Sequence, residues 1–124
     1  MDEVGVRLPV GPKYMRKNNL ILEKMPTLGN YQKYIRKITI ERGFQNETVP
    51  EIVMLFLEEC GEMAKAVRKS IKNIKSDVNS EKFQLENEVS DVFTYLLIIC
   101  NHFNIDLGNA FRDKEVINKK RKWN

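Results

Sequence analysis

Apolar residues recur along this chain at three- and four-residue steps, which is the spacing of residues on one face of an α-helix. The first such pattern begins at Leu28 and continues through Tyr31, Ile35 and Ile38. Gly43 follows it, and glycine is a common residue just beyond the end of a helix. The pattern therefore predicts a helix that begins at Leu28 and stops near Gly43.

A second predicted helix has a clear start signal. Thr48 and Glu51 have the spacing of a capping box, and Pro50 stands in the first turn, where proline is tolerated. Apolar residues then recur at helical steps as far as about Ile71. We therefore predict that this helix begins after Thr48 and continues to about Ile71.

Two more helices are predicted after a polar segment at residues 73–80, which is typical of a loop. The third helix is predicted from Glu81 to about Phe103, and the fourth begins after a cap at Asp106. No segment shows the strict apolar and polar alternation of a half-buried strand. The chain is therefore predicted to be all-α, with four main helices.

The third predicted helix is apolar on nearly all sides between Phe93 and Cys100. Such a helix has to be covered all round, and a chain of 124 residues would struggle to do this alone. We therefore expect a homodimer or homotetramer in which a second subunit completes a helical bundle. Residues 28–124 are predicted to form this helical domain, preceded by a glycine- and proline-containing N-terminal arm at residues 1–27.

Composition narrows the class of protein. A content of 42% hydrophobic and 31% charged residues is that of a soluble globular domain. The longest apolar run is too short to span a bilayer, and Asp2 and Glu3 open a segment unlike a signal peptide. Cys60 and Cys100 lack the spacing of metal ligands and fit core positions in a reducing compartment. A cytoplasmic protein without membrane contact is expected.

Five acidic residues stand out because they have helical spacing within the predicted helices. Glu58, Glu59 and Glu62 form an E-E-x-x-E motif, and Glu88 and Asp91 form E-x-x-D. Residues three and four apart share one face of a helix. Both motifs border apolar runs, where an uncompensated carboxylate is costly. A bound cation would neutralise the repulsion, so the pattern indicates a metal site.

The types of donor narrow the identity of the ion. Either motif alone is more often a solvated face on which Lys65, Arg68 or Lys69 pairs with the glutamates, but two such motifs favour metal binding. Every candidate donor is a carboxylate oxygen, and the single histidine, His102, lies about three turns beyond Asp91. Oxygen ligands suit hard cations, which predicts Mg²⁺, with Mn²⁺ as the alternative.

The net charge of +4 is concentrated near the C-terminus. The basic residues there are Arg112, Lys114, Lys119, Lys120, Arg121 and Lys122. A basic tail beside an acidic centre suits a polyanionic ligand that carries a metal ion, and it also suits non-specific contact with nucleic acid. The aromatic platforms and recognition helices of nucleic-acid-binding modules are not evident, so nucleic acid is not the expected partner.

The acidic motifs and their surroundings resemble the signature of the MazG-like all-α nucleoside triphosphate pyrophosphohydrolases. Residues 57–64, L-E-E-C-G-E-M-A, are similar to the family's L-E-E-x-G-E-x-A core. Residues 88–92, E-V-S-D-V, are similar to its E-x-x-D-V/L step. In the last predicted helix, Lys114, Asn118 and Arg121 fit its K-x-x-x-N-x-x-R pattern.

The resemblance extends over residues 28–123 and implies a reaction. Members of this family hydrolyse (deoxy)nucleoside triphosphates between the α and β phosphates, and so clean the nucleotide pool. The resemblance implies that magnesium is held by four acids, Glu59, Glu62, Glu88 and Asp91. It also implies that Glu58 orients or deprotonates the attacking water.

Further residues are implied to bind the substrate. Lys114, Asn118 and Arg121 would meet the phosphates or the sugar, and Gln32 on the first helix would help to read the base. Tyr95 lies one turn after the second acidic motif and would contact the substrate, although core packing also explains an aromatic residue there. The base and the sugar are left open.

A non-catalytic function is the competing hypothesis. The chain would then be a helical module that binds nucleotides or nucleic acid, for example a degenerate family member that acts as a regulator. The intact set of five acids argues against this alternative. Release of pyrophosphate from a triphosphate distinguishes the two hypotheses.

Overall fold

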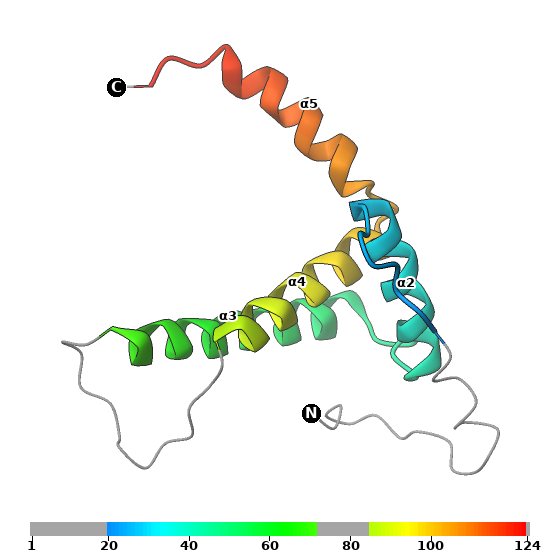
Figure 1. Cartoon of the computed structure of the whole chain (residues 1–124). Coiled ribbons are helices and arrows are strands. Elements are labelled where there is room, and N and C mark those ends of the chain that lie inside the picture. Colours follow the sequence, from blue (N-terminus) through cyan, green and yellow to red (C-terminus); the bar gives the residue numbers. More distant parts are fainter. Residues whose placement is uncertain (1–19, 72–84, 124) are drawn as a thin grey trace, which may run out of the picture. The chain divides into compact units, whose positions relative to one another are not determined.

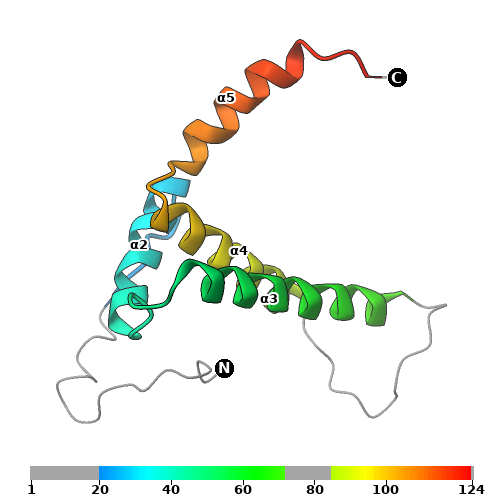
Figure 2. The ribbon, with the colours of Figure 1, turned by 180° about the vertical axis from the view of Figure 1, so that it is seen from behind.

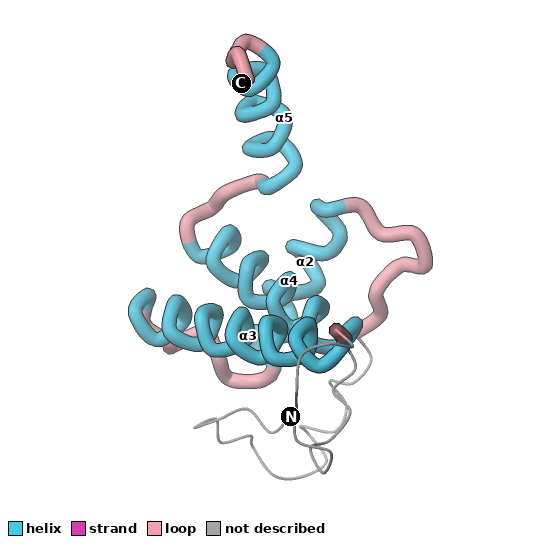
Figure 3. The backbone as a smooth tube through the Cα atoms, turned by 90° about the vertical axis from the view of Figure 1, so that its left-hand side faces the viewer, coloured by secondary structure: helices cyan, strands magenta, loops and turns pink. Residues whose placement is uncertain are grey.

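The computed structural model describes residues 20–71 and 85–123, and these parts of the chain are helical, without strands. The four helices are α2 (Leu28–Glu41), α3 (Val49–Ser70), α4 (Leu85–His102) and α5 (Leu107–Lys119) (Figure 1). Figure 3 shows that only helices and loops make up the described backbone. The all-α prediction with four main helices is confirmed.

Local side chains explain where the helices begin. Thr27 and Asn30 form a capping box at the start of α2, and Thr48 and Glu51 form the predicted one at the start of α3. In each box the threonine oxygen accepts the backbone N–H three residues on, which satisfies a donor that the helix leaves unpaired. Asp106 caps α5 by accepting the N–H of Asn109 at 2.9 Å.

Two helix ends are closed by residues with positive φ. Gly43 follows α2 with a φ of 80°, and Asn104 follows α4 with a φ of 55°. The next N–H in each case reaches back across the turn, from Phe44 to Thr39 at 2.8 Å and from Ile105 to the carbonyl of Cys100 at 2.8 Å. These are the hydrogen bonds of Schellman-type endings. The predicted stop at Gly43 is confirmed.

The chain falls into two compact units. The first unit joins Met1–Asn46 to Cys100–Asn124, and the second is Glu47–Ile99. In the described part of the first unit α2 contacts α5, and Ile35, Ile38 and Cys100 are buried. The second unit contains α3 and most of α4, which overlap when seen from the front and from behind (Figures 1 and 2). None of the described helices has the length and apolar content needed to cross a membrane.

Some predictions fall on other parts of the chain. The predicted loop at residues 73–80, the predicted helix start at Glu81 and most of the predicted arm at residues 1–27 lie outside the described residues. The domain boundary at residue 28 stays a prediction. So does the completion of the bundle by a second subunit.

Candidate metal centre

Glu59 lies on the buried face of α3. The buried residues of this helix, Ile52, Glu59 and Ala66, are spaced by two helical turns and so form one stripe. A carboxylate thus occupies a position on a stripe that is otherwise apolar, and only 6% of its surface is exposed. A buried carboxylate needs a compensating partner, because its desolvation is costly.

Helix α4 supplies two more acidic residues, Glu88 and Asp91, close to Glu59. Tyr95 and Leu97 are buried in the second unit, and Glu88 lies two turns before Tyr95 on the same side of α4. Asp91 lies one turn before Tyr95. Both acids therefore lie on the side of α4 that carries Tyr95, towards the start of the helix.

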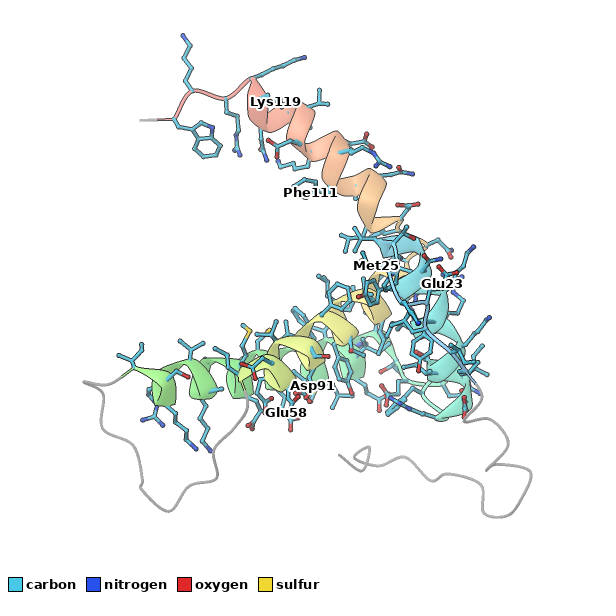
Figure 4. All side chains as sticks on the ribbon, in the orientation of Figure 1. Glu23, Met25, Glu58, Asp91, Phe111 and Lys119 are labelled. Atoms are coloured by element: carbon cyan, nitrogen blue, oxygen red, sulfur yellow. The ribbon has the colours of Figure 1, made fainter. Side chains whose placement is uncertain are left out.

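The three carboxylates meet. One oxygen each from Glu59, Glu88 and Asp91 can be chosen so that all lie within 4.8 Å of one another. Glu59 is buried, Glu88 is half-buried and Asp91 is exposed, so the group runs from the interior to the surface. Figure 4 labels Asp91 on α4 and Glu58 on α3, the two helices that supply the acids. We call Glu59, Glu88 and Asp91 the acidic triad.

Glu58 and Glu62 stand next to the acidic triad. Glu58 is exposed and Glu62 is half-buried. Both charges act on the Glu59 carboxyl, and the charge of Glu62 also acts on Glu88. All five predicted acids therefore belong to one electrostatic cluster within the second unit.

The protonation of the triad reflects this crowding. Burial raises the pKa of Glu59 to about 6, with further contributions from Asp91, Glu88, Glu58 and Glu62. Burial also raises the pKa of Glu88, as does repulsion from Asp91 and then Glu62. Although the Asp91 side chain is exposed, partial desolvation of its carboxyl group raises the pKa of Asp91. All the charged neighbours that raise the pKa of Glu59 are acidic. Repulsion among the ionised carboxylates therefore destabilises the folded chain.

The acidic triad fits a divalent cation. Three carboxylate oxygens at this separation can converge on one ion, and a positive charge there would relieve both repulsion and desolvation. All the donors are oxygen atoms, which suits Mg²⁺ or Mn²⁺ better than softer metals. The structure thus brings together three of the four predicted metal ligands. The fourth, Glu62, is close enough for its charge to raise the pKa of Glu59 and of Glu88.

Gly61, in the middle of the E-E-x-x-E motif, borders open space. A Cβ atom built on it meets nothing within 4 Å among the described residues. Gly61 is therefore not required for close packing within the described chain. Its open space suits the approach of a ligand or of a second subunit.

The predicted substrate residues differ in their surroundings. Tyr95 is buried in the second unit, with 8% of its surface exposed, which agrees with core packing. Lys114 is exposed on α5 in the first unit, and Asn118 follows it one turn later. Arg121, just past the helix end, donates through Nη1 to the Asn118 side-chain oxygen at 3.4 Å. The guanidinium of Arg121 also lies 5.3 Å from the centre of the Trp123 ring.

Gln32 is buried on α2, and its side chain is hydrogen-bonded to other residues of the first unit. It donates to Asn101 at 3.0 Å and to the carbonyl of Ile105 at 2.8 Å. These hydrogen bonds explain its burial without a ligand, and its contact with substrate stays a prediction. The sequence pattern did not single out Asn101, although a polar residue directly after the apolar run that ends at Cys100 was a visible signal.

Comparison with protein-family models identifies a family for most of the chain. Residues 47–122 match the family model described as the MazG nucleotide pyrophosphohydrolase domain. The matched stretch contains all five acids and the helices α3, α4 and α5, whereas α2 lies outside it. No curated protein matches the chain.

Proposed function

The chain belongs to the MazG nucleotide pyrophosphohydrolase domain family, and from this premise we propose that it hydrolyses nucleoside triphosphates to monophosphates and pyrophosphate. The proposed substrates are ribo- or deoxyribonucleoside triphosphates, and the bond cleaved is the one between the α and β phosphates. The observation that carries the proposal is the buried carboxylate of Glu59 within 4.8 Å of those of Glu88 and Asp91.

In this proposal four acidic residues bind the metal ion and the fifth acts on the attacking water. Glu59, Glu88 and Asp91, together with Glu62, hold Mg²⁺, with Mn²⁺ as the alternative. When bound, the ion supplies positive charge to the phosphate oxygens and makes water more acidic. Exposed Glu58 orients the attacking water and accepts its proton as the water oxygen bonds to phosphorus and pyrophosphate leaves.

The remaining predicted residues bind the substrate in this proposal. Lys114, Asn118 and Arg121 contact the phosphates or the sugar, Tyr95 contacts the substrate, and Gln32 contributes to recognition of the base. Cationic and amide donors suit this task because they match the charge and the acceptor oxygens of the substrate. The hydrogen bond between Arg121 and Asn118 supports the assignment, since it holds two of these side chains together.

A panel of nucleotides tests the activity. The four common ribonucleoside and four deoxyribonucleoside triphosphates are incubated with the protein and Mg²⁺, and the products are separated by ion-exchange chromatography. Monophosphate and pyrophosphate are expected in equal amounts. Diphosphate with orthophosphate would refute the proposed bond, and binding without turnover would favour the non-catalytic module.

Substitution of one ligand links the activity to the acidic triad. Glu59→Gln removes a charge and a metal ligand, and we expect kcat/KM to fall by at least about 100-fold. The matched control is Glu86→Gln, which changes an exposed acid in the first turn of α4 that is not in the triad. Equal activity of the two variants would contradict the proposed role of Glu59.

The proposal includes an assembly and a location. A homodimer or homotetramer is supported by large apolar side chains that the described chain leaves uncovered, such as Met54 with 67% and Leu57 with 61% of its surface exposed on α3. A cytoplasmic setting agrees with the two cysteines, Cys60 and Cys100, which are both free thiols.

A further inference from the structure

The side chain of Gln32 connects α2 to both sides of the turn between α4 and α5. Its amide nitrogen Nε2 donates to the side-chain oxygen of Asn101 at 3.0 Å and to the carbonyl of Ile105 at 2.8 Å. Its oxygen Oε1 accepts the backbone N–H of Leu107 at 3.1 Å. Leu107 is the first residue of α5, so Gln32 satisfies one of the donors that the start of this helix leaves unpaired.

Asn101 closes the same network from the α4 side. Its nitrogen Nδ2 donates to the backbone carbonyl of Gln32 at 2.9 Å. Its oxygen accepts from Gln32 and also from Arg36 Nη2, at 3.3 Å. Gln32 is buried, and no buried side-chain polar atom in the described residues lacks a partner. We call the reciprocal pair Gln32 and Asn101 the amide latch.

Among the described residues, α5 contacts α2 and is otherwise largely exposed. None of its residues is buried. A Cβ atom built on Gly108 would lie 3.9 Å from Leu28, which places the first turn of α5 beside α2. Further along, Phe111 has 66% and Ile117 has 55% of its surface exposed. The direction of α5 relative to α2 is therefore set at its first turn, where the amide latch acts.

We propose that Gln32 and Asn101 are positioning residues that fix the direction of α5 and thereby hold its substrate-binding side chains in place. This inference rests on the proposed function, in which Lys114, Asn118 and Arg121 on or just beyond α5 bind the substrate. A small rotation at the start of a helix displaces residues several turns away. Preorganised side chains lose less conformational entropy on binding, so a loosened helix weakens substrate affinity.

The two partners of the latch can be broken separately. Gln32→Ala and Asn101→Ala are each expected to raise KM about tenfold while kcat changes by less than about threefold, because ground-state and transition-state binding are lost together. The double variant is expected to resemble either single variant, since both substitutions break one network. Asn109→Ala is the control, because it removes an exposed asparagine from the first part of α5 that lies outside the latch.

Amide exchange gives a readout that does not depend on activity. The N–H of Leu107 is expected to exchange at least about tenfold faster in Asn101→Ala, whereas the amides of α3 keep their wild-type rates. Asn101→Asp serves as a milder variant, since it keeps an acceptor for Gln32 and for the cationic Arg36 but loses the Nδ2 donation to the carbonyl of Gln32. Intermediate exchange at Leu107 and an intermediate KM are expected for it, even if Gln32→Ala folds poorly.

The possible results separate this inference from the proposed function. A wild-type protein without turnover of any triphosphate in the panel would overturn both. An active wild type in which Gln32→Ala raises KM and Asn101→Ala does not would overturn the positioning role and support direct contact of Gln32 with substrate. Faster exchange at Leu107 with unchanged KM would overturn the positioning role alone.

Discussion

At the scale of single residues, the protonation of Glu59 predicts an unusual dependence of stability on pH. Its pKa rises from 4.5 to about 6 in the folded chain, mainly through burial. The folded state therefore binds this proton more tightly than the unfolded state. Its contribution to stability is complete below about pH 4.5 and is lost as the pH rises through about 6.

The measurement compares two proteins without metal. Between pH 5 and pH 7, the free energy of unfolding of wild type is expected to fall relative to that of Glu59→Gln by about 1 kcal/mol, after allowance for solvent screening. Urea unfolding at each pH gives this difference directly. The comparison is needed because Glu51, whose pKa is lowered by its hydrogen bonds to Thr48, contributes with the opposite sign. A constant difference between the two proteins would contradict the account of Glu59.

At the scale of elements, the sequence predicted helices well because their signals are local. Thr48 and Glu51 are three residues apart, and their capping box forms where the pattern placed it. The acids of the triad could also be identified from the sequence, because helical periodicity placed Glu59 and the pair Glu88 and Asp91 next to apolar runs. A fixed local spacing carries enough information to predict a helix face.

The amide latch, in contrast, could not be predicted from local residue spacing. Gln32 and Asn101 are separated by 69 residues, and no periodicity links two single polar side chains at that distance. The resemblance to the family suggested a substrate contact for Gln32, whereas its hydrogen bonds give it partners within the first unit. Buried polar networks of this kind are set by tertiary structure, which a single sequence does not encode at any fixed spacing.

At the scale of the whole molecule, the uncovered apolar side chains of α3 predict self-association. Met54→Glu would place a charge at a surface that a second subunit is proposed to cover, and burial of an unpaired charge is costly. We expect self-association to weaken by at least about 100-fold, with a shift towards the monomer mass in multi-angle light scattering.

Met25→Glu is the matched control for this experiment. Met25 is 88% exposed and lies outside the helices, so the same substitution there is expected to leave the mass unchanged. A wild-type protein that stays monomeric at high concentration would contradict the proposed assembly. A shift in both variants would show that the change is not specific to α3.

The claim on which the account depends is that Glu59, Glu88 and Asp91 bind a divalent cation. Titration with Mn²⁺, followed by the electron paramagnetic resonance signal of the free ion, measures this without any substrate. At pH 7.5, wild type and Glu86→Gln should bind Mn²⁺ alike and release it on addition of Mg²⁺, and Glu59→Gln should bind at least about tenfold more weakly. Equal binding by all three proteins, or none by wild type, would contradict the account.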